Sequence, residues 1–332
     1  MPAGKVLRQL IRAGSSGDIA GFKNVSEMII REERQKQHHL LANDLEKILY
    51  GEPTHQGIIS NRISERIPVD QERGLPLVVV RQPARSLEDV VLSGETRQAL
   101  DDILQQHHRM DVLKSYGLRP TDKILFYGPP GCGKTLTAEV VAMELGRPLA
   151  IVRVDSVVSS YLGETAANLR KVFDFIDTTP MVALFDEFDA LGKEREDSTE
   201  HGELKRVVNA VLQMLDSYLG KSVIIAATNH EQMLDSAIWR RFEEVLYFGL
   251  PTKDELLSLL QIKLRGVRRN FEETEEKTLS LFSGMSHAAV ERILLRAIKE
   301  MILTGQEFLE INHIKKAIKR EQARTKRVSG RK

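Results

Sequence analysis

Short apolar runs alternate with longer amphipathic stretches between Ser86 and about Pro251. Runs of four or five apolar residues bounded by polar or turn residues are typical of buried strands, and amphipathic stretches of ten or more residues are typical of helices. The predicted strands are Ile124–Tyr127, Ala150–Val154, Val182–Phe185, Val223–Ala227 and Val245–Phe248. Strands that alternate with helices predict an α/β fold, a parallel sheet sandwiched by helices.

The segments on either side of this region have a different pattern. Residues 1–50 show helical periodicity, for example at Val25 and Ile29, and are predicted to be a helical N-terminal segment that recruits partners. Residues 51–84 are rich in Gly and Pro and are predicted to be a linker that ends in a short strand near Leu77–Val80.

No strand pattern follows Pro251. Thr252 and Glu255 form a capping box, and Ser286 and Asn312 are predicted to cap two further helices. We therefore expect an α/β domain over 85–251, a small all-helical lid domain over 252–318, and a basic tail over 319–332.

Composition indicates a folded protein outside the secretory pathway. The 332 residues include 42% hydrophobic and 29% charged side chains, and 48 basic against 47 acidic residues give a net charge of +1. The single cysteine, Cys132, excludes an intrachain disulfide and suits a reducing compartment. No apolar run approaches the ~18 residues of a membrane helix. We expect a cytoplasmic protein without a membrane partner.

The balanced charge conceals a basic C-terminus. Residues 319–332 carry seven basic and one acidic residue, a net of +6, so the other 318 residues sum to −5. Such a tail binds nucleic acid in some proteins and is a solvated, disordered extension in others, and the second interpretation is the more common one.

The strongest chemical signal is a glycine-rich loop between a predicted strand and a predicted helix. It fits the pattern G-x-x-x-x-G-K-[ST], in which backbone N–H groups and a helix N-terminus surround phosphate oxygens. The residues expected to bind the nucleotide are Gly128, Pro129, Pro130, Gly131, Cys132, Gly133, Lys134 and Thr135. Lys134 would reach the β- and γ-phosphates, and the helix N-terminus would lower the pKa of Cys132.

Two carboxylates follow the next strongly apolar run. Asp186 and Glu187 come directly after Val182–Phe185, and ligands of parallel sheets bind at the carboxyl ends of the strands. Asp186, together with the hydroxyl of Thr135, is expected to hold Mg²⁺ that accompanies ATP. Glu187 is expected to polarise the attacking water, so that the reaction is hydrolysis.

Polar residues also follow the run Val223–Ala227. Asn229 is a candidate to orient the attacking water, although an Asn after a strand is more often a turn residue. Arg240 and Arg241 form either a surface pair or a source of positive charge for the γ-phosphate of a neighbouring subunit.

The sequences GPPGCGKT, LFDEFDAL and IIAATNHEQMLDSAIWRRFEEVLYFGLP resemble, in order and spacing, the AAA family of ATPases over about 86–318. The spacing from Asn229 to the arginines is similar to that of the katanin and spastin branch. The resemblance implies a ring, usually a hexamer, in which Arg240 and Arg241 complete the next subunit's site. It also implies a strand between the phosphate-loop strand and the strand before Asp186.

The resemblance assigns a substrate-gripping loop to Tyr161, Leu162 and Gly163, and less strongly a second one to Lys193–Glu203. Without it, Tyr161 would be read as a core residue. In the lid, His287 and Ala289 replace the usual Gly and Asp, which argues against the family's nucleotide contact there. Arg292 is expected to be a surface residue rather than a second sensor of nucleotide.

The leading functional hypothesis is Mg²⁺-dependent ATP hydrolysis in a homo-oligomeric ring that pulls protein substrates through a central pore, alone or with a separate effector such as a protease. The alternative is a nucleic-acid-directed ATPase of the loader type, suggested by the basic C-terminus. A nucleotide-gated scaffold without turnover is a third class, and the intact set of Lys134, Glu187, Asn229, Arg240 and Arg241 argues against it.

Overall fold

The computed structural model describes residues 24–29, 67–70, 74–157, 162–191, 210–233 and 236–329. The chain divides into two compact units, Met1–Arg66 and Ile67–Lys332. In the first unit, residues 24–29 are helical and the side chains of Val25 and Ile29 are buried, as the helical pattern predicts for these two positions. The rest of the predicted N-terminal segment lies outside the described residues.

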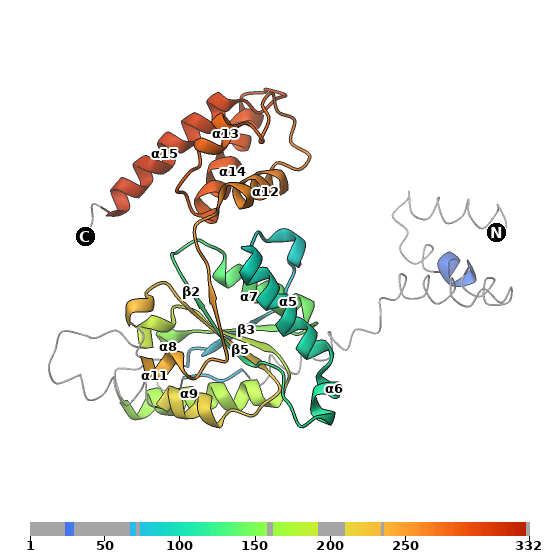
Figure 1. Cartoon of the computed structure of the whole chain (residues 1–332), viewed down its shortest axis with the longest axis vertical. Helices are drawn as coiled ribbons and strands as arrows, with labels where there is room; N and C mark the ends of the chain where they lie inside the picture. Colours follow the sequence, from blue (N-terminus) through green and yellow to red (C-terminus); the bar gives the residue numbers. More distant parts are fainter. Residues whose placement is uncertain are drawn as a thin grey trace. The chain divides into compact units, whose positions relative to one another are not determined.

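The second unit is built on a six-stranded sheet with the order β1-β3-β4-β5-β2-β6 (Figure 1). The strands are β1 (Val78–Arg81), β2 (Lys123–Tyr127), β3 (Leu149–Val152), β4 (Val182–Phe185), β5 (Val223–Thr228) and β6 (Glu244–Tyr247). All neighbours are parallel except β1 and β3, which are antiparallel. All the predicted strands are present, and β5 separates β2 from β4 as the resemblance implies.

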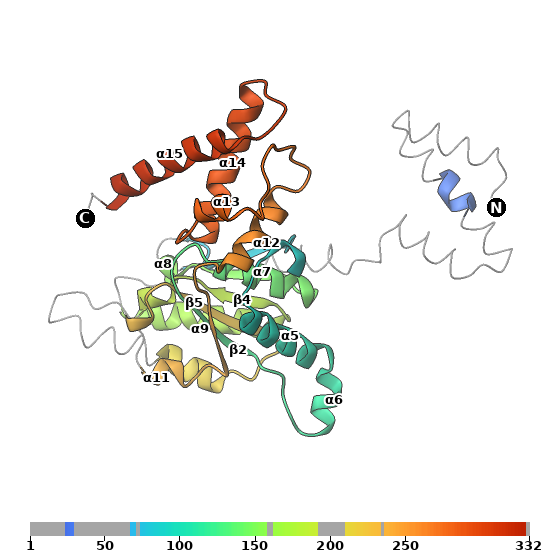
Figure 2. The ribbon, with the colours of Figure 1, turned by 45° about the horizontal axis from the view of Figure 1, so that its top comes forward.

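Helices cover both faces of the sheet, which confirms the predicted fold class. α5 (Gly94–His108) and α7 (Lys134–Glu144) lie on one face, and α9 (Leu162–Thr178) lies on the other (Figures 1 and 2). Alternate strand residues point to opposite faces. Ile124 and Leu184 therefore join the core beneath α5 and α7, whereas the ring of Phe185 packs on Phe173 of α9, with ring centroids 5.8 Å apart.

Shorter elements connect these layers. They are the 3-10 helices η1 (Leu87–Asp89), η2 (Phe188–Leu191) and η3 (Glu231–Met233), the helices α6 (Met110–Ser115), α8 (Val154–Val157) and α11 (Ser236–Trp239), and a helix over residues 210–217. β1 lies inside the segment predicted as a linker, so the sheet begins before residue 85.

Four helices with a hydrophobic core of their own follow the sheet: α12 (Lys253–Lys263), α13 (Glu276–Ser280), α14 (His287–Leu303) and α15 (Ile311–Ser329). The predicted caps Thr252 and Ser286 are confirmed, because their side chains accept hydrogen bonds from Glu255 N and Ala289 N. The predicted cap at Asn312 is wrong, because α15 already includes Ile311.

The basic C-terminal segment is helical through Ser329, contrary to the expectation of a disordered tail. The first part of the same helix, before the predicted tail, packs in the core through Ile314 and Ile318. Glu300 of α14 lies within ion-pair distance of Lys316 (3.2 Å) and Arg320 (3.8 Å), so part of the positive charge is paired within the chain. No helix among the described residues is long and apolar enough to span a membrane.

Candidate nucleotide-binding site

The glycine-rich loop links the end of β2 to the start of α7, and its path depends on glycine. Gly128, Gly131 and Gly133 have positive φ angles of 132°, 77° and 99°, a region that side-chain-bearing residues rarely adopt. At Gly128 a Cβ atom would lie 2.3 Å from the carbonyl oxygen of Phe248, just after β6. The motif glycines thus let the loop turn tightly beside the end of β6.

Lys134 is the first residue of α7, and its side chain turns back into the loop. Nζ donates hydrogen bonds to the carbonyl oxygens of Gly128 (2.7 Å) and Pro129 (2.9 Å). Burial lowers the pKa of Lys134, and Cys132, Asp186 and Asp189 act in the opposite direction. An ammonium group held only by neutral carbonyl oxygens can be transferred to phosphate oxygens that enter the loop, which fits a bound triphosphate.

Thr135 and Asp186 come together across the loop, although 51 residues separate them in the sequence. Thr135 Oγ1 donates a hydrogen bond to Asp186 Oδ2 at 2.8 Å. A hydroxyl and a carboxylate are hard oxygen donors of the kind that Mg²⁺ prefers. The two side chains predicted to hold Mg²⁺ therefore form a suitable donor pair at the carboxyl end of β4.

Glu187, the predicted base, has an unusual backbone. Its φ is 52°, and it is the only residue other than glycine with positive φ in the described part of the chain. This conformation costs a side-chain-bearing residue about 1–2 kcal/mol. The Glu187 N–H donates to Asp186 Oδ1 at 2.9 Å, and the Glu187 side chain is exposed. Strain of this kind clusters at functional sites, and the sequence carried no signal of it.

The ends of β5 and β2 lie side by side. Tyr127 pairs with Thr228, so Gly128 and Asn229 follow at the same level of the sheet. Thr228 Oγ1 donates a buried hydrogen bond of 2.9 Å to Asp189 Oδ1. This hydrogen bond connects the end of β5 to the turn that carries Glu187, and nothing in the sequence signalled it.

The two predicted arginines differ in their surroundings. Arg241 Nε lies 3.3 Å from the carboxylate of Asp216, and Nη1 donates to the carbonyl oxygen of Ala237 at 2.9 Å. Arg240 is exposed, and its side chain makes no hydrogen bond or ion pair within the described residues. Arg241 is thus held by its own chain, whereas Arg240 faces solvent.

The lid contacts the phosphate loop directly. The N–H of Ala288 donates to the carbonyl oxygen of Gly131 at 2.9 Å. A Cβ atom at Gly131 would lie 3.0 Å from Ser286 Oγ. This contact joins protein atoms, so the expectation that the altered lid sequence lacks the family's nucleotide contact stays a prediction. Arg292 points elsewhere, since its Nε donates to Glu321 Oε1 of α15 at 2.9 Å.

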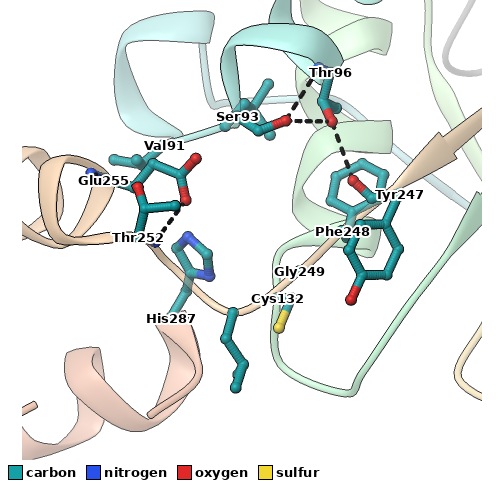
Figure 3. A pocket seen from close by; sticks show the side chains of 12 residues that line it. Val91, Ser93, Thr96, Cys132, Tyr247, Phe248, Gly249, Thr252, Glu255 and His287 are labelled. Carbon is teal, nitrogen blue, oxygen red and sulfur yellow. Dashed lines mark hydrogen bonds between the residues drawn. The ribbon is translucent and has the colours of Figure 1, made fainter. Parts of the chain in front are cut away.

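A pocket lies where the lid meets the loop (Figure 3). Its wall includes residues from the segment before α5, the loop, the end of β6 and the lid. They are Val91, Leu92, Ser93, Thr96, Cys132, Tyr247, Phe248, Gly249, Leu250, Thr252, Glu255 and His287. The mostly apolar wall next to a phosphate loop suits a flat nucleobase whose phosphates extend onto the loop.

Cys132 lines this pocket and is buried, with 3% of the residue exposed. Burial raises its pKa, and the nearby Lys134 only partly opposes this. The expectation of a lowered pKa is therefore wrong, because desolvation of the thiolate outweighs the positive charge and the helix N-terminus.

The substrate-gripping loops remain predictions. Tyr161 and Lys193–Glu203 lie outside the described residues. Leu162 and Gly163 begin α9, and the structure describes only their backbone.

Comparisons with known proteins agree with this arrangement. Residues 124–250 match the family model of the ATPase family associated with various cellular activities (AAA). The chain is 39% identical to an uncharacterized AAA family ATPase of Sinorhizobium fredii, over 98% of this chain and 97% of that protein. It is 33% identical to a putative 26S proteasome regulatory subunit homolog of Methanocaldococcus jannaschii, over 62% of this chain and 57% of that protein. It is 34% identical to the ATPase family gene 2 protein of Schizosaccharomyces pombe, over 64% of this chain and 27% of that protein. The katanin and spastin branch stays a prediction.

The surroundings of Cys132 predict slow alkylation. At pH 7.5 iodoacetamide should modify Cys132 roughly 10-fold or more slowly than an exposed thiol, because burial both shields the sulfur and reduces its thiolate fraction. With increasing pH, the rate should continue to rise beyond the pKa of an ordinary thiol, where the rate of an exposed thiol levels off, because burial raises the pKa of Cys132. Mass spectrometry of the single cysteine measures this rate. A Cys132→Ser chain that carries Ser217→Cys, at the exposed last residue of the helix over 210–217, provides the comparison. Equal rates in the two chains would contradict the burial argument.

Proposed function

The chain belongs to the AAA family of ATPases and carries a single AAA domain, and we propose that it uses ATP hydrolysis in a ring of identical chains to pull on and unfold protein substrates. The main observation that supports a ring is the difference between Arg240 and Arg241. One arginine is anchored within its own chain, and the other is exposed in the turn between α11 and β6.

Within one chain, each part of the site has a proposed task. The loop amides and Lys134 bind the phosphates, and Thr135 with Asp186 holds Mg²⁺. When bound, Mg²⁺ neutralises negative charge on the phosphate oxygens. Glu187 accepts a proton from the attacking water, and Asn229 orients that water from the end of β5.

None of the described residues assigned to the site above is an arginine. Charge that develops on the γ-phosphate is stabilised in related phosphoryl transfers by an arginine, in many cases from another subunit. Arg241 is engaged by Asp216 and Ala237 of its own chain. We infer that Arg240 enters the neighbouring chain's site and that Arg241 holds the segment that presents it. A repeated head-to-tail contact of this kind closes into a ring.

The proposed substrate is protein. Two lines support it: the relative named as a 26S proteasome regulatory subunit homolog, and the resemblance of Tyr161–Gly163 to a substrate-gripping loop. An aromatic ring repeated around a pore would hold an extended polypeptide through apolar contacts without reading its sequence.

The nucleic-acid alternative rests on the exposed basic residues of α15, including Lys315 and Lys319. The ion pairs of Glu300 with Lys316 and Arg320 reduce the charge available on this helix. Protein is therefore the favoured substrate. The last experiment of this subsection also tests whether nucleic acid stimulates the ATPase rate.

Mixing two inactive variants tests whether sites are shared. Arg240→Ala should lower the ATPase rate about 10³-fold or more, and Glu187→Gln should lower it about 10²-fold or more. An equal mixture should recover about a quarter of the wild-type rate, because that share of contacts joins an intact Glu187 to an intact Arg240 in a random head-to-tail ring. A mixture no more active than its components would contradict sharing.

Arg241→Ala is the matched control for this experiment. It should lower the melting temperature, because it removes the contacts with Asp216 and Ala237, whereas Arg240→Ala should leave the melting temperature unchanged. Equal melting temperatures for the two variants would contradict the assignment of different tasks.

Tyr161 provides a test of the protein substrate. Casein, an unstructured protein, should stimulate the ATPase rate of the wild type and of Tyr161→Phe, but not of Tyr161→Ala, because only the first two keep an aromatic ring. The measured quantity is the ratio of the rates with and without casein. Stimulation of Tyr161→Ala equal to that of the wild type would contradict the gripping role. Stimulation by DNA but not casein, decreasing steeply with salt, would favour the alternative.

A further inference from the structure

Most polar groups in the wall of the pocket beside the phosphate loop already have partners (Figure 3). The hydroxyl of Ser93 donates to the hydroxyl of Thr96 at 2.8 Å, and the hydroxyl of Thr96 donates to the carbonyl oxygen of Tyr247 at 3.0 Å. Thr252 and Glu255 pair with each other through the capping box that opens α12. These groups therefore maintain the shape of the wall.

His287 differs from them. It is the first residue of α14, and Figure 3 shows its ring pointing into the pocket. Both ring nitrogens are shielded from solvent, and neither has a hydrogen-bond partner among the described residues. Buried polar atoms without partners are rare in proteins, because they lose their hydrogen bonds to water without compensation.

The pocket is large enough for more than a water molecule. Its volume is about 170 Å³, against the ~10–15 Å³ that one water requires by a comparable measure. Phe248 and Val91 contribute apolar surface to its wall, and Cys132 belongs to the phosphate loop itself. A ligand that fills this space would lie between the loop and the His287 ring.

The ring has a defined hydrogen-bonding capacity. Burial lowers the pKa of His287, and the carboxylate of Glu255 only partly opposes this, so the imidazole is neutral at pH 7. A neutral imidazole offers one donor and one acceptor. The edge of adenine likewise carries an amino donor beside a ring-nitrogen acceptor, whereas phosphate and Mg²⁺ do not present both.

We propose that His287 hydrogen-bonds the polar edge of the adenine base and is a specificity-determining residue of the nucleotide site. The proposal rests on the proposed function, because it requires a nucleotide whose phosphates lie on the loop. The start of α14 is well placed for this task. Ala288, the next residue, donates its N–H to Gly131 of the loop, so one short segment contacts the loop and presents the ring.

The test compares two ligands on the wild type and three variants. The ligands are ATP and inorganic tripolyphosphate, which keeps the phosphates and lacks the base, and the measurement is the dissociation constant by calorimetry. His287→Phe keeps a ring of similar shape without nitrogens, His287→Gln keeps a donor and an acceptor, and His108→Gln changes an exposed histidine of α5.

His287→Phe should raise the dissociation constant of ATP about 3- to 10-fold, the effect of losing one hydrogen bond, and should leave that of tripolyphosphate unchanged. His287→Gln should restore most of the ATP affinity, and His108→Gln should match the wild type. Equal ATP affinity of wild type and His287→Phe would overturn the proposal, and so would an equal loss for both ligands.

Two further results separate the remaining explanations. If the loss seen with ATP disappears with 2′-deoxy-ATP, the ring contacts the sugar and the base assignment is overturned. If the loss persists, the base assignment is supported. If wild-type protein binds neither ATP nor tripolyphosphate, the proposed function fails rather than the role of His287.

Discussion

The close approach of backbone to backbone at the glycine-rich loop is the constraint on which the rest of the site depends. Gly128 lies against the carbonyl oxygen of Phe248 at the end of β6, and Gly131 accepts a hydrogen bond from Ala288 at the start of α14. The loop is therefore fixed by the sheet on one side and by the lid on the other. Because both contacts involve backbone atoms, they leave no space for a side chain at Gly128. A shift of this loop would therefore disturb its contacts with β6 and with the lid.

A second set of contacts places the reacting groups on the same edge. Parallel pairing brings the carboxyl ends of β2, β4 and β5 to one side of the sheet. The hydrogen bond from Thr135 to Asp186 joins α7 to β4, and the one from Thr228 to Asp189 joins β5 to the turn after β4. These links surround Glu187, whose strained backbone is kept in place by its neighbours. Contacts within the chain thus hold the edge in place, and such preorganised polar groups stabilise charge in a transition state.

The sequence predicted the strands and the loop, because apolar runs and the G-x-x-x-x-G-K-[ST] spacing are local signals. It failed where the outcome depends on contacts between distant segments. The predicted cap at Asn312 was wrong because Ile311 already belongs to α15. The tail is helical because it continues α15, whose first part packs in the core through Ile314 and Ile318. The prediction of a lowered pKa for Cys132 was wrong, because the burial of this side chain could not be inferred from its neighbours in the sequence. The positive φ of Glu187, the anchoring of Arg241 and the position of the His287 ring likewise arise from tertiary packing.

In the proposed mechanism, a complete hydrolytic site needs two chains. The most direct measurement is the steady-state ATPase rate per chain as a function of protein concentration, with the molecular mass followed in parallel by sedimentation. This mechanism predicts a rate per chain that increases cooperatively with concentration and reaches a plateau when the chains are assembled, because each site then receives Arg240 from a neighbour. A rate per chain that is high and independent of concentration in a monomeric protein would contradict it.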